Sequence, residues 1–430
     1  MKGFGNMCKK IKKCFDKELM VKLFCDILIV ILFSAGSLIP LYGINRTQFD
    51  TWLNSDVLNN VNIFGLLSGN SFKSMSIFAL GIAPYITASI IVQLLTVIIP
   101  KLDELRKQSQ EKIEKYTYLL AGVFTVIQSV LTTIYFYNNG LLQKPNIFYF
   151  SIVAAGLCIG AVVVILMAKF LDKHGIGKGI SIILLTNIVS QLPSSMQSLY
   201  QTFVPQQING VLFGVITFVV ISFLIIAVIC LQDAEKRIPI QQAGQTRAMH
   251  KLNYLPIKLN LSNVMPVIFT SSIFQFIILI SNFVKNDTFT YVAQFFNMGN
   301  WFSITNPIYS LGLIPYVILI VAFAYFYVAF SFDAEDVADG LKKKNIVIVG
   351  IRPGQLTVDY LKRELKWFVF LGAILLTIIV TLPIAIIQFL NVTNFALVGT
   401  SLLIMNSVSV ELFKEIETEI ITKREVDFFS

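Results

Sequence analysis

Charged residues are scarce in this chain of 430 residues. They make up 14% of it, whereas soluble proteins carry about 25%. Hydrophobic residues reach 55%, and the mean hydropathy is +0.73. This composition excludes an ordinary soluble globular protein and indicates an all-α, polytopic membrane protein.

Residues that usually perform catalysis or bind metals are also few. The two histidines, His174 and His250, lie far apart in segments expected to be solvated loops, and the five cysteines show no paired spacing. No expected membrane span has a charged residue near its middle, although proton- and ion-coupled pumps usually need one. We therefore expect no enzyme activity, no metal site and no cofactor.

The stretch 76–100 is a long uncharged segment that also contains polar residues. It has no charged side chain over about 25 residues, and a helix of that length crosses about 30 Å of hydrocarbon. Ile82, Ile86, Ser89 and Gln93 recur at helical spacing and share one face. A face that mixes apolar and polar residues suits the lining of a passage that opens and closes. On this stretch alone, ordinary helix–helix packing is the favoured interpretation. The residues that interrupt the apolar run are Gly81, Pro84, Thr87, Ser89 and Gln93.

Ten apolar segments of spanning length are expected along the chain. The first should be a retained span, because no small-x-small cleavage site follows it. A further apolar piece, 62–72, is too short to cross and contains two glycines, which suggests a re-entrant or half-helical element. The expected spans are 23–43, 76–100, 117–137, 147–170, 176–192, 210–231, 264–284, 306–332, 367–389 and 393–412.

Lysine and arginine fall almost entirely on one side of these spans. When the N-terminus is placed in the cytoplasm, only Arg46, Lys73, Lys144 and Lys285 lie on the opposite side. This bias predicts that both termini are cytoplasmic. The other 30 of the 34 basic residues lie in segments 1–22, 101–115, 169–178, 236–258, 342–366 and 414–424.

Ten spans divide into two five-helix halves of opposite orientation. A weak sequence similarity between the halves supports this division. Pro84 and Ser89 have the same spacing as Pro266 and Ser271, which lie in the second span of the other half. Inverted repeats place their functional site where the halves meet. The expected parts are a cytoplasmic basic arm (1–22), an N-terminal half (23–192), an external linker (193–209), a C-terminal half (210–412) and a cytoplasmic tail (413–430).

Two long polar segments of the C-terminal half, 232–263 and 333–366, combine prolines and glycines with basic residues. These residue types make stiff, protruding loops with fixed charge. A solvated surface is the ordinary explanation for one such loop. Two loops on the same side suggest a docking surface for an acidic or RNA-rich partner.

Six sequence blocks, which follow one another from the first span to the tenth, together resemble the SecY family, the central channel subunits of the Sec protein translocase. The resemblance implies an hourglass channel with a ring of aliphatic side chains at its waist. It also implies a plug on the outer side and a lateral gate toward lipid. The blocks are LGIAPYITASIIVQLLTVIIPKL (80–102), HGIGKGISI (174–182), EKRIPIQ (235–241), NVMPVIFTSSI (263–273), GIRPGQLT (350–357) and GTSLLI (399–404).

The resemblance assigns roles to particular residues. Leu184 departs from the isoleucine of the family pattern but keeps the ring aliphatic, Asn187 is more polar than the pattern, and Met265 is a neighbouring candidate. The implied ring is Ile82, Ile86, Leu184, Ile188, Ile268 and Ile404. The implied plug lies within 62–72 and includes Asn62, Ile63, Phe64, Gly65, Leu66, Leu67, Ser68 and Gly69. The implied gate residues are Thr87, Gln93, Gln128, Ser272 and Phe276. The implied docking residues are Arg237, Arg247, Lys251 and Arg352.

The function that the resemblance implies is passage of unfolded preproteins across the cell (plasma) membrane, with release of hydrophobic helices into lipid through the gate. The implied partners are SecE- and SecG-type small membrane subunits, the SecA motor ATPase, the ribosome, preproteins with signal peptides, and membrane lipid. The alternatives are a secondary transporter with five-plus-five inverted repeats and a membrane anchor without a conduit. The transporter would need intramembrane charge, which the expected spans lack.

Overall fold

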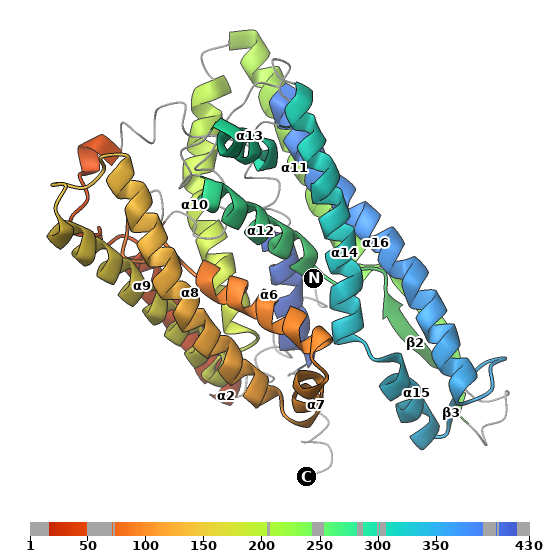
Figure 1. The fold of residues 1–430 in the computed structure, drawn as a ribbon. Helices are drawn as coiled ribbons and strands as arrows, with labels where there is room; N and C mark the ends of the chain where they lie inside the picture. The colour runs from red at the N-terminus through yellow and green to blue at the C-terminus, as the bar shows by residue number, and fades with distance from the viewer. Residues whose placement is uncertain are drawn as a thin grey trace. The chain divides into compact units, whose positions relative to one another are not determined.

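The computed structural model describes residues 17–49, 71, 74–203, 207–242, 253–281, 287–298, 301, 307–389, 401 and 404–418. Most of the described chain is helical (Figure 1). The chain divides into two compact units. The first comprises residues 1–202, 278–293 and 400–430, and the second comprises residues 203–277 and 294–399.

Long helices build the first unit. In it, α6 packs along α8, and α8 packs along α9. The apolar contact comes from residues at helical spacing, since Val153, Leu157 and Ala161 on α9 are all fully buried. The helices are α2 (Lys17–Gly36), α6 (Ala83–Ile98), α7 (Pro100–Gln108), α8 (Gln110–Asn138), α9 (Ile147–His174), α10 (Gly179–Phe203) and a C-terminal helix of residues 404–418.

The second expected span is helical only in part. Residues 76–82 form turns, and α6 begins at Ala83. Gly81 has a φ of +52°, which glycine adopts without a steric penalty. Pro84 lies in the first turn of α6, where its missing N–H leaves no helical hydrogen bond unmade. The proline therefore starts this helix and does not interrupt it.

The charged segment 101–116 lies between the second and third expected spans, so the sequence predicts a loop there, and this prediction is wrong. It is helical except at Ser109, since α7 follows α6 after a bend of 108° and α8 begins at Gln110. Pro100 opens α7 at a position that proline favours. Asp103 in the first turn and Arg106 in the last turn suit the helix dipole.

The second unit combines helices with a small antiparallel sheet, which departs from the all-α prediction. The strand order is β2-β1-β3. The strands are β1 (Glu235–Gln242), β2 (Asn253–Lys258) and β3 (Ile346–Ile348). The helices are α11 (Gln207–Asp233), α12 (Met265–Ser281), α13 (Asp287–Phe296), η3 (Pro307–Gly312), α14 (Leu313–Ser331), α15 (Ala334–Lys343) and α16 (Gln355–Phe389), with parts of α12 and α13 in the first unit.

Two prolines explain why the sequence did not predict this sheet. Pro239 lies in the central strand β1, where a proline argues against a strand. Strand β3 pairs with β1 only from Ile240 onward, and the Pro239 carbonyl accepts a hydrogen bond from Val349 N–H at 3.2 Å. Pro256 lies in β2, which is an edge strand. Neither position therefore costs a hydrogen bond that the sheet needs.

We call the three strands, α15 and residues 355–366 of α16 the sheet platform, and its buried core continues into α14 and the following part of α16. Ile238, Ile348 and Leu361 are buried in this core. The Asp333 side chain caps α15 by accepting a hydrogen bond from Glu335 N–H at 2.9 Å. The platform therefore packs against the helices α14 and α16.

Four helices of the described residues are long and apolar enough to cross a membrane, and the bent pair α6–α7 would make a fifth. Shorter apolar helices occur at 179–190, 221–233 and 265–278. The number of ten spans therefore stays a prediction. The four helices cover Glu111–Asn138, Ile147–His174, Pro307–Lys343 and Gln355–Ala385.

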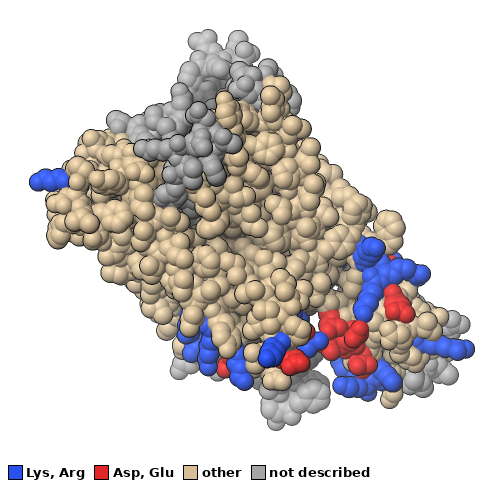
Figure 2. All heavy atoms as spheres, viewed as in Figure 1, with Lys and Arg blue, Asp and Glu red and all other residues tan. Residues whose placement is uncertain are grey.

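Charged side chains gather in limited areas of each unit. On the face in Figure 2, the charges of the first unit gather mainly where α7 and the start of α8 lie, and those of the second unit gather over the sheet platform. The surfaces along the long helices are mostly uncharged in this view. This pattern suits apolar helix surfaces in lipid and polar ends in water.

Candidate functional site

The predicted ring residues all lie on or next to helices and are all buried. The first unit contributes Ile82, Ile86, Leu184, Ile188 and Ile404, and the second contributes Ile268. Their exposed fractions are between 0 and 5%. We call these six the seal residues, after the role that the family resemblance implies for them.

The mixed face of α6 is present as predicted. Ile86 N–H donates to the Ile82 carbonyl at 3.1 Å, and Gln93 Nε2 donates to Ser89 Oγ at 3.1 Å. The amide oxygen of Gln93 is buried and accepts no hydrogen bond from the described residues. The hydrogen bond of the Gln93 side chain is therefore made within its own helix.

Asn187 is the polar neighbour of the seal residue Ile188. It is 1% exposed, and neither its amide oxygen nor its amide nitrogen has a hydrogen-bond partner among the described residues. A buried amide without partners is rare in folded proteins and costs stability. The polar residue that the sequence indicated next to Ile188 is therefore buried.

Two of the predicted gate residues contact each other. Gln128 Nε2 on α8 donates to Thr87 Oγ1 on α6 at 3.3 Å, so the bond joins the second and third expected spans. On α12, Ser272 Oγ donates to the Ile268 carbonyl at 2.8 Å, and Phe276 is half-buried. Each side of the predicted gate is thus held by bonds within its own unit.

The predicted plug lies outside the described residues, apart from Ser71. The Ser71 side chain is 1% exposed. Its carbonyl accepts hydrogen bonds from the N–H of Ser76 at 3.0 Å and from the Oγ of Ser76 at 3.1 Å. The C-terminal end of the predicted plug is therefore anchored just before α6.

Two of the predicted docking residues lie on the sheet platform, whereas Arg247 and Lys251 lie outside the described residues. Arg237 forms an ion pair with Glu235 at 2.8 Å and lies over the Tyr254 ring. Arg352 is exposed, as predicted, in the turn that follows β3.

The turn around Arg352 is built from local features. Gly350 and Gly354 have φ values of +85° and +110°, which favour glycine. The Arg352 carbonyl accepts a hydrogen bond from Thr357 Oγ1 at 3.0 Å, which ties the turn to the start of α16. The backbone at Arg352 is therefore ordered while its guanidinium faces solvent.

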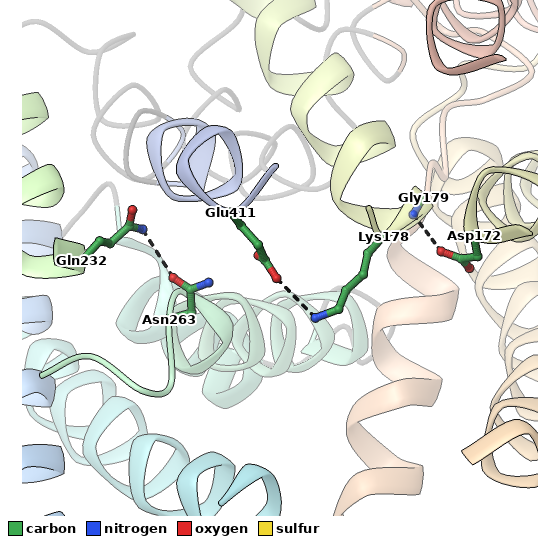
Figure 3. Close-up of polar contacts among 6 residues, drawn as sticks. All are labelled: Asp172, Lys178, Gly179, Gln232, Asn263 and Glu411. Atoms are coloured by element: carbon green, nitrogen blue, oxygen red, sulfur yellow. Dashed lines mark hydrogen bonds and ion pairs between the residues drawn. The ribbon is translucent and has the colours of Figure 1, made fainter. Parts of the chain in front are cut away.

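The loop 175–179, which joins α9 to α10, is tied by carboxylates from two helices. The Asp26 carboxylate on α2 accepts a hydrogen bond from Ile176 N–H at 3.1 Å. The Asp172 carboxylate on α9 accepts one from Gly179 N–H at 2.7 Å (Figure 3). These bonds anchor the loop backbone at both ends.

A third tie to this loop comes from the C-terminal helix. Lys178 Nζ lies 3.2 Å from the Glu411 carboxylate (Figure 3). One turn further along, Glu415 has a buried oxygen with no hydrogen-bond partner among the described residues. Burial and the nearby Glu411 raise the pKa of Glu415, and Lys178 partly offsets this rise. The lysine therefore stabilises two carboxylates on one helix face.

A polar turn precedes α12 in the second unit. Asn263 has a φ of +55°, and its amide oxygen accepts a hydrogen bond from Gln232 Nε2 at 3.3 Å (Figure 3). Asn260 Nδ2 donates to the Asn263 carbonyl at 3.1 Å, and Ser262 Oγ donates to the Asn260 side chain. These bonds fix the start of the helix that carries Ile268.

Comparison with known proteins identifies the family. The SecY family model matches residues 76–413. A protein of Guillardia theta named protein translocase subunit SecY is 34% identical over 425 residues, which cover 97% of this chain and 98% of that protein. The chain belongs to the SecY family. A SecY of Staphylococcus carnosus, also named a protein translocase subunit, is 34% identical over 94% of this chain and 95% of its own length.

Solved structures of SecY-type channels share the fold. A structure described as that of a protein-conducting channel aligns with a TM-score of 0.66 at 17% identity, covering 94% of this chain and 93% of that one. A second structure has a TM-score of 0.66 at 16% identity over the same shares of both chains, and its description says that the plug domain of SecY maintains a membrane seal. The ribosome-bound yeast Ssh1 complex has a TM-score of 0.61 at 16% identity, covering 94% and 90%.

The SecY family match covers the seal residues, the predicted gate and Arg352, but the predicted plug precedes it. The hydrogen bonds and the ion pair that hold the loop 175–179 were not predicted from the sequence, although this glycine-rich stretch was recognised as one of the six blocks. Ile176 and the Asp26 carboxylate that accepts its hydrogen bond are 150 positions apart in the sequence, and Lys178 and Glu411 are 233 positions apart. Local spacing gives no signal for contacts of this kind.

Proposed function

We propose that this chain is the protein-conducting subunit of a Sec translocase. It passes unfolded preproteins across the cell membrane and releases hydrophobic helices into lipid. Membership of a family whose named members are protein translocase subunits supports this function. The observation that carries the mechanism is the burial of six aliphatic residues on four different expected spans.

The seal residues close the pore by excluding water. An aliphatic constriction repels water and ions without a specific binding site, and it can widen around any peptide. Aliphatic side chains make no hydrogen bonds with the passing chain, so the pore tolerates many sequences. This role suits the six positions, which hold only Ile and Leu in this chain.

Besides the widening of the seal, transport requires the plug to leave the pore and the gate to open toward lipid. We assign residues 62–72 as a plug, because its two glycines cost about 1 kcal/mol each in a helix and suit an element that must leave its seat. Polar contacts such as Gln128–Thr87 hold membrane helices together by about 0.6–2 kcal/mol. A hydrophobic signal helix is able to compete with contacts this weak.

The plug assignment has its own test. Deletion of residues 62–72 is expected to leave membrane assembly intact and to raise resting ion conductance or relax the selectivity for signal sequences. Membrane assembly is measured by protein amount in membranes and conductance in planar bilayers. Complete loss of the protein from the membrane would instead assign the segment a structural role.

The sheet platform faces the cytoplasm in this proposal, as do both termini, because 30 of the 34 basic residues lie on that side. The platform then offers Arg352 and Arg237 to the SecA motor ATPase or the ribosome. SecE- and SecG-type small subunits complete the complex. The ribosome as a partner is supported by the fold shared with a ribosome-bound complex.

The decisive experiment measures transport directly. The chain is reconstituted in vesicles with the small subunits and SecA, and an unfolded preprotein with a signal peptide is added. We expect ATP-dependent protection of the preprotein from external protease, and no protection without ATP. A secondary transporter or a membrane anchor would give none, even when the Staphylococcus carnosus relative is active under the same conditions.

A further inference from the structure

The ion pair between Lys178 and Glu411 joins two helices that carry seal residues. Lys178 immediately precedes α10, six residues before Leu184 and ten before Ile188. Glu411 lies seven residues after Ile404 on the C-terminal helix. All of these residues belong to the first unit. The pair therefore connects one end of α10 to the C-terminal helix, about two turns from the seal residues of each.

The loop that carries Lys178 has little room to move. Gly177 has a φ of +85°, and a Cβ at this residue would overlap the Glu415 carboxylate. A Cβ at Gly179 would overlap the Ala168 carbonyl on α9. Close backbone approach of this kind needs glycine. Because the loop contacts both α9 and the C-terminal helix closely, the backbone at Lys178 is held in place.

We infer that Lys178 and Glu411 are positioning residues of the seal. The ion pair holds the C-terminal helix at one axial position relative to α10, and this position keeps Ile404 level with Leu184 and Ile188. Loss of the pair lets the helix shift along α10 and opens gaps among these side chains. The inference rests on the proposed function, because it concerns residues that seal a pore.

The expected size of the effect follows from exposure. The side chains of Lys178 and Glu411 are 55% and 24% exposed, so solvent screens their attraction. Exposed ion pairs shift a two-state equilibrium by about fivefold at most. Charge reversal at Lys178 adds repulsion from Glu411 and Glu415. We therefore expect Lys178→Glu to raise resting conductance about fivefold.

The test uses the full chain with its small subunits in planar bilayers without substrate. Lys178→Glu and Glu411→Lys are each expected to raise resting ion conductance about fivefold, and the double variant should return it to within about twofold of wild type. Lys178→Met, which removes the charge without adding repulsion, should give about twofold. Lys173→Glu is the matched control, because Lys173 is exposed in the last turn of α9 and its reversal changes the net charge equally.

One more variant separates this inference from the proposed function. Ile188→Ser should conduct ions at rest if the seal is assigned correctly. If Ile188→Ser conducts while the Lys178 and Glu411 variants resemble wild type, the positioning role is wrong and the channel function stands. The role is also wrong if Lys173→Glu conducts as much as Lys178→Glu, or if the double variant conducts as much as the single ones. If Ile188→Ser stays tight, the seal assignment fails, and the positioning role fails with it.

Discussion

The seal residues and the sheet platform differ in what surrounds their side chains. The six seal residues are aliphatic, and each is at most 5% exposed. The platform has a buried core around Leu361, but charged pairs such as Lys236–Glu364 and Lys362–Glu335 cover its outside. In the proposed function the seal excludes water at a few positions, whereas the platform presents exposed charges around a buried core. Substitutions should therefore separate ion leakage from docking.

Arg352 should give the largest effect on transport. We expect Arg352→Glu to abolish motor-driven translocation, because it reverses the exposed charge of the platform turn. Arg352→Lys should weaken translocation by about tenfold, because an ammonium cannot make the bidentate contacts of a guanidinium. The measurement is ATP-dependent preprotein import into vesicles that contain equal amounts of each variant.

Lys258→Glu is the control for this prediction, since Lys258 is exposed on β2 and carries the same charge. It should keep most of the import activity. Equal import by wild type and Arg352→Glu would remove this turn from the mechanism. Resting conductance should stay at the wild-type level in all three variants, because the seal is untouched.

Substitutions of the seal residues should change resting ion conductance, which the Arg352 variants should leave unchanged. We expect Ile188→Ser combined with Ile404→Ser to raise resting conductance by tenfold or more, since each buried aliphatic side chain contributes about 1.5–3 kcal/mol to the closed state. Ile183→Ser is the matched control. Ile183 is 1% exposed on the same helix but is not a seal residue. Similar conductance from both variants would attribute the leak to general loss of packing.

The core of the platform tests whether it folds as a domain. Leu361 is fully buried, and Leu361→Ala should destabilise the platform by about 2–5 kcal/mol. Limited proteolysis should then cut the platform faster while resting conductance stays low. Leu356→Ala, at an exposed position at the start of α16, should leave the cutting rate unchanged. A large rise in conductance from Leu361→Ala would mean that the platform and the seal are not separable.

The smallest effect is expected at the gate. Thr87→Val removes the hydroxyl that accepts the hydrogen bond from Gln128, which should loosen α6 from α8 by about 0.6–1.7 kcal/mol. Import of a preprotein with a weakened signal peptide should improve. Thr96→Val is the comparison, because the Thr96 hydroxyl bonds to the Val92 carbonyl of its own helix and to no other described residue. If both variants import the weak substrate equally, the bond between α6 and α8 does not restrain the gate.

The assignment of the seal residues came from the family resemblance and stays a prediction. The sequence by itself determined the apolar character of the long helices and the clustering of the basic residues in a few segments. These features are local, because hydropathy and helical spacing act over one or a few turns. The exposed turn at Arg352 was also predictable, since Pro353 restricts the backbone there and Gly354 permits a sharp turn.

Only the tertiary structure decided the sheet and the ties of the loop 175–179. Pro239 argued against a strand, and it fits β1 only because β3 begins to pair one residue later. The carboxylates of Asp26 and Glu411 meet the loop across 150 and 233 positions of sequence. Contacts of this range arise when whole helices pack, so the pattern of a single segment does not contain them.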